Sequence, residues 1–295
     1  MIQTIAFIGV GIMGKPMVRN LMKAGFSLHI FARHKEKVED VIAEGAAFYP
    51  SIKECVQGCD AVITMVGFPK DVEEVYYGKN NIFDSAEPGA YLIDCTTSSP
   101  SLAVRLHEDG SKKGFHVLDV PVTGGESGAI KGILSMLVGG DKEDYKACMP
   151  IFQAVGTNIN YQGKAGNGQH AKMANQILVA GALSGVCEAL AYGKARGMDL
   201  QVLFDSLSTG AGGSAQFSAL GPKILAGNYQ PGFFIKHIIK HIIKDLKLAL
   251  QEADTLGLKL DMVPEVLADF EDLAAKGHEN EGSQALIKHY IDMEK

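Results

Sequence analysis

The sequence predicts an α/β protein in which a doubly wound, mostly parallel sheet is followed by an all-α domain. Short apolar runs alternate with helical patterns over roughly the first 160 residues, which is typical of such a sheet. From Gly166 onward the strand signal stops, and helical periodicity with small side chains takes over. A chain of 295 residues can bury two cores, so we assign residues 1–163 and 164–295 to separate domains.

The first predicted strand, Thr4 to Ile8, leads into a glycine turn and a helix over residues 15–24. Gly9, Gly11 and Gly14 form a G-x-G-x-x-G pattern between the strand and the helix. Residues without a Cβ atom let the chain turn tightly and bring backbone amides, at the positive end of a helix, against a pyrophosphate. The turn therefore predicts a Rossmann-type dinucleotide site.

A basic sequence follows the second predicted strand, Leu28 to Ala32. An NAD site usually presents a carboxylate to the ribose 2′-hydroxyl at this place, and the sequence has none there. Arg33 can instead bind a 2′-phosphate through two N–H groups, and His34 and Lys35 add positive charge. We therefore expect NADP, with NAD as the second option. The alternative for these residues is a solvated basic loop.

Five further strands are predicted, at residues 61–65, 91–93, 116–118, 135–138 and 158–161. The segment Asp119 to Gly125 follows one of them and precedes a helical pattern. Exposed backbone amides of Thr123, Gly124 and Gly125 could hold a carboxylate at such a place. Pro and Gly are also ordinary turn residues, so a simple strand-to-helix turn is the alternative.

One unusually long helix is predicted over Asn167 to Ala195. Lys172 and Asn175 are three residues apart near its start and share a face. We expect this face to look into a cleft between the domains, where ligand sites are common, and the alternative is a solvated lysine. The apolar stretch from Ile177 to Gly193 contains a serine and a glutamate, which favours a buried helix over a membrane span.

A tandem tetrapeptide, Lys-His-Ile-Ile, occupies residues 236–243. Four added residues amount to about one helical turn, so we expect the duplication to lengthen one helix. It also places His237 and His241 four residues apart. Ile238 stands where a zinc-binding H-E-x-x-H helix has its glutamate, so no metal site is predicted.

The composition of the chain indicates which kinds of partner and which cellular location to expect. A net charge of −6 argues against nucleic acid, because phosphate contacts need a basic face. The five cysteines are an odd number scattered over a long chain, which is typical of reduced thiols rather than of a disulfide framework. The first strand begins a few residues from the N-terminus, with no basic region or cleavage site before it, so we expect no signal peptide. We expect a cytoplasmic protein with no membrane partner.

Four segments, in order along the chain, resemble the β-hydroxyacid dehydrogenase family, which includes 3-hydroxyisobutyrate dehydrogenase and tartronate semialdehyde (2-hydroxy-3-oxopropionate) reductase. These segments are residues 7–14, 119–125 and 166–175 and the pair Lys244-Asp245. The resemblance spans essentially the whole chain. Met13, inside the glycine turn, is typical of the group.

The resemblance implies a role for each matching residue. Lys172 would be the catalytic group, and the substrate would be held by Thr123, Gly124, Gly125 and Asn175. The residues that would contact the cofactor are Gly9, Gly11, Ile12, Met13, Gly14, Arg33, Met65, Val66, Thr97, Phe234 and Lys244. If the duplication shifts the register, Lys240 or Lys236 would replace Lys244. The family usually has serine where Thr123 stands and proline where Gly67 stands.

The implied reaction is hydride transfer between NADP(H) and the terminal carbon of a small β-hydroxy acid or semialdehyde, such as 3-hydroxyisobutyrate or tartronate semialdehyde. The oxygen that gains charge during reduction needs a proton and a positive charge nearby. A lysine, with an unperturbed pKa of about 10.4, supplies both near neutral pH.

Two other functions on this scaffold are a non-catalytic NADP-binding module and an imine or ketone reductase. The presence of Lys172 favours a dehydrogenase over both. The candidate substrates are small carboxylates that differ from one another by small groups. No sequence motif identifies these groups, so the exact substrate is not predicted. The small-residue helices lead us to expect a homodimer or a homotetramer.

Overall fold

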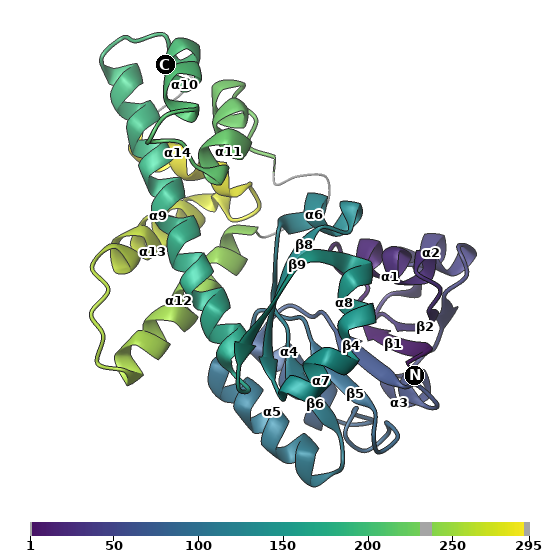
Figure 1. Ribbon diagram of the computed structural model, residues 1–295. Coiled ribbons are helices and arrows are strands. Elements are labelled where there is room, and N and C mark those ends of the chain that lie inside the picture. The colour runs from purple at the N-terminus through teal and green to yellow at the C-terminus, as the bar shows by residue number, and fades with distance from the viewer. Residues whose placement is uncertain (1, 231–237, 292–295) are drawn as a thin grey trace. The chain divides into compact units, whose positions relative to one another are not determined.

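The computed structural model of the protein describes residues 2–230 and 238–291 (Figure 1). The chain divides into two compact units, with the division between Lys172 and Met173. The first unit contains a sheet with helices, and the described part of the second contains helices alone. The predicted fold class, a Rossmann-type sheet followed by an all-α region, is confirmed.

The described residues of the first unit form one nine-stranded sheet in the order β3-β2-β1-β4-β5-β6-β8-β7, with β9 paired to β8. The strands are β1 (Thr4–Ile8), β2 (Ser27–Phe31), β3 (Ala47–Phe48), β4 (Ala61–Thr64), β5 (Tyr91–Asp94), β6 (His116–Asp119), β7 (Val122–Thr123), β8 (Leu134–Gly140) and β9 (Gly156–Gly163). Strands β1 to β6 pair in parallel, whereas β8 runs antiparallel to β6 and β7 and parallel to β9.

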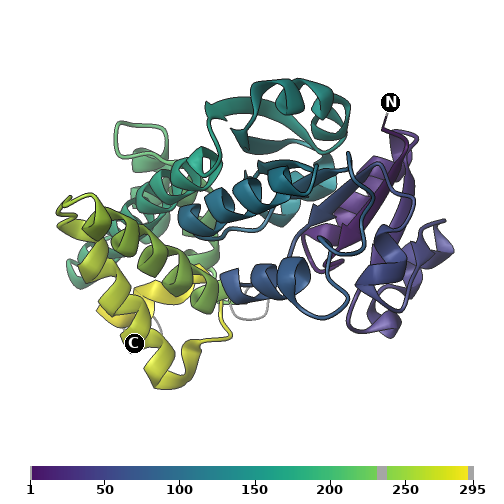
Figure 2. The same ribbon diagram turned by 90° about the horizontal axis from the view of Figure 1, so that it is seen from below.

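Helices cover both faces of this sheet (Figures 1 and 2). They are α1 (Gly14–Lys23), α2 (Glu39–Ala43), α3 (Ile52–Val56), α4 (Pro69–Tyr77), α5 (Pro100–Lys112), α6 (Gly125–Lys131), α7 (Lys142–Ala147) and α8 (Met149–Val155), with a 3-10 turn at Lys35–Lys37. Ile5 and Phe7 of β1 belong to the core that contains α1, α6 and α8 residues. Ala6 and Ile8 belong to the core with α3, α4 and α5. Because side chains alternate along a strand, an unbroken apolar run buries both faces of a parallel sheet.

The strand order reverses between β1 and β4, which are neighbours in the sheet although β2 and β3 separate them in the sequence. Ligands of such sheets bind outside the carboxyl ends of the strands at this reversal. Gly9 follows β1 with a φ of +96°, and a Cβ there would lie 2.3 Å from the carbonyl oxygen of Met65, the residue after β4. Only glycine allows these two loops to pack so closely.

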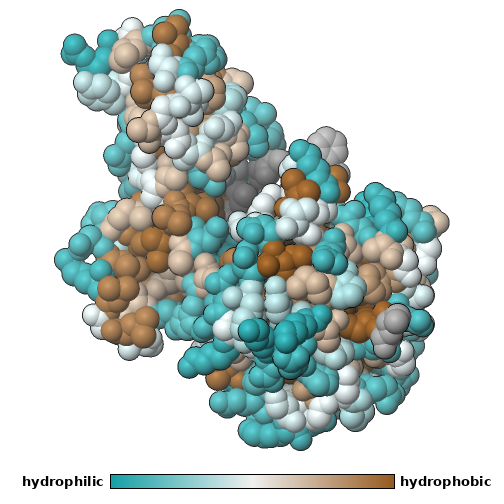
Figure 3. Space-filling model, viewed as in Figure 1, coloured by the Kyte–Doolittle hydropathy of each residue, from teal (hydrophilic) through white to brown (hydrophobic). Residues whose placement is uncertain are grey.

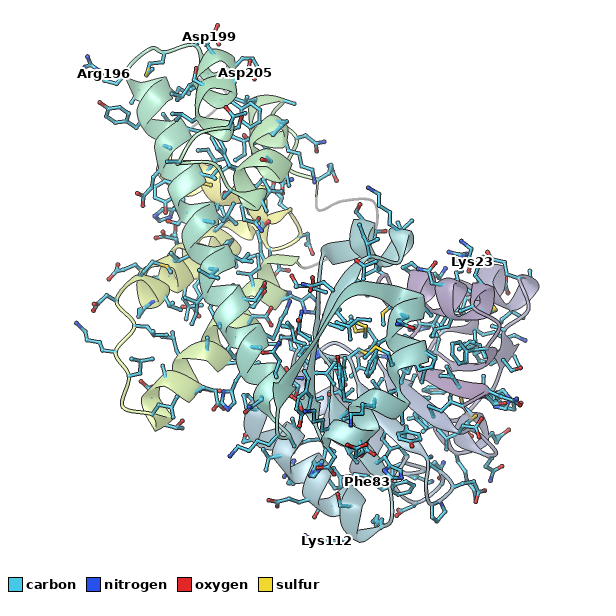
Figure 4. The ribbon with its side chains drawn as sticks, in the orientation of Figure 1. Lys23, Phe83, Lys112, Arg196, Asp199 and Asp205 are labelled. Carbon is cyan, nitrogen blue, oxygen red and sulfur yellow. The ribbon has the colours of Figure 1, made fainter. Side chains whose placement is uncertain are left out.

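The second unit is built around the long helix predicted from the sequence, α9, a continuous 29-residue helix whose first residues belong to the first unit. Its helices are α9 (Asn167–Ala195), α10 (Leu200–Ser208), α11 (Ala215–Leu225), α12 (Ile238–Thr255), α13 (Met262–Leu273) and α14 (Ile287–Tyr290), with helical turns at Ala274–His278 and Ser283–Leu286. Asp199, labelled in Figure 4, starts α10 by accepting hydrogen bonds from the backbone amides of Gln201 and Val202.

One stripe of α9 lies in the core of the helical unit. Leu183, Cys187 and Leu190 are at most 1% exposed and pack with residues of α11, α12 and α13. By length and composition α9 is the one described helix that could cross a membrane, and core helices pass the same test. All five cysteines of the chain are free thiols and buried.

Candidate active site

The glycine turn after β1 has two packed positions and one open position. A Cβ at Gly14, the first residue of α1, would lie 2.4 Å from the carbonyl oxygen of Gly9, so the helix packs closely on the turn. A Cβ at Gly11 would meet no atom within 4 Å, and Gly11 is exposed. The outer edge of the turn is therefore open at Gly11.

Backbone amides at the start of α1 suit an anion. Met13 occupies the N-cap position without a side-chain capping hydrogen bond, and it follows Ile12 in the turn. The first N–H groups of a helix have no partner within the helix, and they favour negative charge. An open glycine edge beside an uncapped helix start fits the pyrophosphate of a dinucleotide.

The end of β2 is tied to the glycine turn, because the Gly9 amide donates a hydrogen bond of 3.1 Å to the carbonyl oxygen of Phe31. Arg33 lies two residues further on, is exposed, and makes no ion pair or side-chain hydrogen bond with any described residue. Nδ1 of the neighbouring residue, His34, lies 3.2 Å from Glu36 Oε1. The structure thus brings Arg33 to the edge of the sheet where the glycine turn lies.

The loops after β4 and β5, which contain Met65, Val66 and Thr97, are joined by hydrogen bonds. The Val66 amide donates to Thr96 Oγ1 at 3.0 Å. Asp94, buried at the end of β5, accepts from Thr64 Oγ1 at 2.7 Å and from the Thr96 amide at 3.1 Å. Met65, Val66 and Thr97 are half-buried at the carboxyl ends of adjacent strands, as cofactor contacts would be.

Asp119, at the end of β6, fixes the start of α9. Its Oδ1 accepts a hydrogen bond of 2.8 Å from the Gly166 amide, and its Oδ2 accepts one of 2.9 Å from the Gln169 amide. The Gln169 side chain is fully buried; it donates to the Thr96 carbonyl oxygen at 2.7 Å and accepts from the Ser98 amide at 2.9 Å. The first turn of α9 is therefore bound to the ends of β5 and β6.

Lys172 lies three residues after Gln169 and is 8% exposed, so it is not a solvated surface lysine. Its Nζ donates a hydrogen bond of 2.9 Å to the carbonyl oxygen of Val122. Thr123 is the residue directly after Val122. The ammonium group is thus buried next to the segment that the sequence predicts to hold a carboxylate.

The position of Thr123 differs from the prediction. Residues 119–125 were expected to form a turn between a strand and a helix, but Val122 and Thr123 form β7, which pairs with β8. Asp119 also pairs with β8, so β7 continues the line of β6 along the same partner strand. Gly124 and Gly125 are exposed with φ of +127° and +63°, and α6 begins at Gly125.

The remaining predicted site residues belong to the second unit. Asn175 Nδ2 donates to Gln176 Oε1 at 2.8 Å. Lys244 Nζ lies 3.2 Å from Asp245 Oδ1, and the Lys244 side chain is 11% exposed. Lys240 is 43% exposed and pairs with Glu279, so it differs in environment from Lys244.

Phe234, Lys236 and His237 lie outside the described residues. In the parts of the chain that the structure does describe, no group of three His, Cys, Asp or Glu side chains is arranged to hold a metal ion.

Asp119 and Gln169 are the residues whose function the sequence did not reveal. Both lie inside segments with a recognised motif, yet Asp119 is paired with residues 47 and 50 positions away. A buried carboxylate at a helix start is a known capping arrangement, but the partner helix of a given Asp is known only once the fold is known.

Comparison with known proteins matches nearly the whole chain. Residues 4–163 match the sequence family described as the NAD binding domain of 6-phosphogluconate dehydrogenase. Residues 166–290 match the family described as NAD-binding of NADP-dependent 3-hydroxyisobutyrate dehydrogenase.

Similar proteins cover the chain from end to end. An uncharacterised oxidoreductase of Bacillus subtilis is 45% identical over 98% of this chain and 99% of its own length. A Pseudomonas aeruginosa protein named NAD-dependent L-serine dehydrogenase is 34% identical over 93% of each chain. The structure of Mycobacterium tuberculosis 3-hydroxyisobutyrate dehydrogenase with L-serine has a TM-score of 0.87 and 29% identity, covering 98% of this chain and 99% of that one.

The burial of Asp119 should make the stability of the folded protein depend on pH. Burial raises the pKa of Asp119 to about 6, although hydrogen bonds from Gly166 and Gln169 act in the opposite direction. Between pH of about 4 and about 6 the folded protein holds a proton that the unfolded chain has released. The resulting stabilisation is fully present below pH of about 4 and is lost as the pH rises through about 6.

The test compares the wild-type protein with Asp119→Asn, which cannot titrate at this position. Urea unfolding should show the free energy of unfolding of the wild type increasing relative to the variant, by up to about 3 kcal/mol, as the pH falls from about 7 to about 4. A difference between the two proteins that does not change with pH would contradict this assignment.

Proposed function

The chain belongs to the β-hydroxyacid dehydrogenase family, and we propose that it transfers hydride between NADP(H) and the terminal carbon of a small β-hydroxy acid or semialdehyde. As a family member it is an NAD(P)-dependent oxidoreductase. The proposed substrates are 3-hydroxyisobutyrate, tartronate semialdehyde or acids of similar size. Each carries a carboxylate and one reacting oxygen.

One observation carries the proposal: the Lys172 ammonium is buried and donates to the carbonyl oxygen of Val122, the residue before Thr123. A buried ammonium group held beside the substrate would stabilise the substrate oxygen that becomes negative during reduction. Such a group stabilises charge most when it is held in place and shielded from water.

The chain's own residues would orient the substrate and supply the proton. When bound, the nicotinamide supplies the hydride. Gly124 and Gly125 are exposed and follow Val122, which accepts the hydrogen bond from Lys172; their amides together with the Thr123 hydroxyl would bind the substrate carboxylate. Lys172 would then donate its proton to the aldehyde oxygen during reduction and take it back during alcohol oxidation.

NADP is the proposed cofactor because Arg33 is exposed after β2, near the glycine turn, and residues 31–35 contain no carboxylate that could accept a hydrogen bond from a ribose hydroxyl. Guanidinium groups match phosphate oxygens in geometry and charge. A relative with 34% identity is named as NAD-dependent, so use of NAD is found among similar proteins. The residues after β2 would decide this preference.

Self-association as a homodimer or a homotetramer is also proposed, for a cytoplasmic protein whose thiols stay reduced. On the face seen in Figure 3, hydrophobic side chains gather over the C-terminal helices. Leu178 and Tyr192 of α9 are 74% and 68% exposed. Large exposed apolar residues on one helix favour burial against a second copy.

Replacement of Lys172 by Ala should remove the proton donor. NADPH oxidation with a panel of small semialdehydes should fall at least about 100-fold in kcat, while the Kd of NADPH stays nearly unchanged. Lys164→Ala, an exposed lysine just before α9, is the matched control and should retain activity. A Lys172→Ala enzyme with turnover within a fewfold of the wild type would rule out this role.

Replacement of Arg33 by Ala should weaken NADP(H) binding by about 10- to 100-fold and leave NAD(H) binding within about threefold, because only NADP carries the 2′-phosphate. Fluorescence titration of both reduced cofactors measures the change. Lys53→Ala, an exposed lysine on α3, is the control for a general effect of charge. Equal losses for the two cofactors would show that Arg33 does not recognise the phosphate.

Replacement of Leu178 by Glu should lower the oligomeric state, since it places a charge on an apolar contact surface. Light scattering during gel filtration measures the mass of the wild type and the variant. Val104→Glu, which is 37% exposed on α5, is the control. A monomeric wild type, or two variants with the same mass shift, would overturn the proposed interface.

A further inference from the structure

We propose that Asp245 is a positioning residue that serves two groups at once: through Gln176 it orients the side chain of Asn175, and directly it holds the ammonium of Lys244. The inference rests on the proposed function and on the roles that the family resemblance implies, in which Asn175 contacts the substrate and Lys244 contacts the cofactor. All four residues lie in the second unit, on α9 and α12.

A chain of hydrogen bonds leads from Asp245 to Asn175. Gln176 Nε2 donates to Asp245 Oδ2 at 2.7 Å, and Gln176 Oε1 accepts from Asn175 Nδ2 at 2.8 Å. A carboxylate only accepts hydrogen bonds, so it must face the NH₂ end of the Gln176 amide. The oxygen of Gln176 then faces the other way and must meet a donor.

The orientation of Asn175 follows from the same rule. Its NH₂ group is turned toward Gln176 Oε1, and its Oδ1 accepts no hydrogen bond from any described residue. The acceptor oxygen of Asp245 thereby sets which end of the Asn175 amide is left for a ligand. The end that remains is an acceptor, which is what a substrate hydroxyl group requires from its partner.

The second link of Asp245 is electrostatic. The residue is 6% exposed, and its Oδ1 is buried, accepts no hydrogen bond within the described structure, and lies 3.2 Å from Lys244 Nζ. A buried carboxylate is costly unless a cation compensates it. Asp245 therefore holds the Lys244 ammonium near Oδ1 while its Oδ2 accepts the hydrogen bond from Gln176.

The network is not needed to join the two helices. Met173 and Ile177 of α9 already pack with Leu248 and Ala249 of α12. The hydrogen bonds that link Asn175, Gln176 and Asp245 lie beside this apolar contact. They fix the orientation of the three side chains, because each hydrogen bond requires a donor that faces an acceptor. Loss of the network should therefore change ligand binding more than it changes the packing of the two helices.

Two substitutions separate the two links. Gln176→Met, of similar length and apolar, breaks the link to Asn175 and leaves the pair of Asp245 and Lys244. Asp245→Asn keeps an oxygen that can accept from Gln176 but removes the charge that holds Lys244. Gln251→Met, at an exposed position on α12, is the matched control.

Kinetics with a semialdehyde and fluorescence titration of NADPH, together with the melting temperature of each variant, give the readouts. Gln176→Met should raise KM for the semialdehyde about tenfold and leave the Kd of NADPH within about threefold. Asp245→Asn should raise the Kd of NADPH about tenfold and leave KM at saturating NADPH within about threefold. The control should change neither value.

The proposal is overturned if both variants change the same constant, if neither variant changes either constant, or if their effects follow only the loss of melting temperature. A wild-type protein that binds NADPH but turns over no semialdehyde would instead contradict the proposed function. The nucleotide titration of Asp245→Asn still reports on the link to Lys244 in that case. The two failures are therefore distinguishable.

Discussion

The buried carboxylate of Asp119 is the contact on which the candidate site depends. It accepts hydrogen bonds from two amides at the start of α9, where the helix has unpaired N–H groups and a partial positive charge. Gln169 extends the same attachment to the loop after β5. Lys172 follows by three residues, so its position beside Val122 is fixed by this attachment rather than by the lysine alone.

The glycine turn and the loops beside it form the other half of the site. Gly9 and Gly14 are required by packing, since a Cβ at either would lie within 2.4 Å of a backbone oxygen. Gly11 has open space around it, and this matches a position where a ligand approaches the backbone. The same short motif thus has two physical roles. The close packing at Gly9 and Gly14 brings the start of α1, the loop after β4 and the end of β2 to the strand reversal of the sheet.

Much of this arrangement was predictable from the sequence. The strands from β1 to β6 that are longer than two residues are rich in apolar residues, and pattern and motif identify the glycine turn, Lys172 and α9. The two-residue strands β3 and β7 carry no periodicity, so Thr123 was expected in a turn. The pairing of Asp119 with α9, and the chain from Asp245 through Gln176 to Asn175, join residues far apart in sequence. Local propensity holds no information on such pairs.

The proposed mechanism requires the Lys172 ammonium to meet the reacting oxygen of the substrate. A crystal structure of the protein with NADP⁺ and a small β-hydroxy acid would show this contact. We expect Lys172 Nζ within about 2.6–3.2 Å of the substrate hydroxyl oxygen, with the carboxylate against Thr123 to Gly125. A substrate oxygen bound by another side chain, with Lys172 Nζ outside hydrogen-bond distance of the substrate, would contradict it.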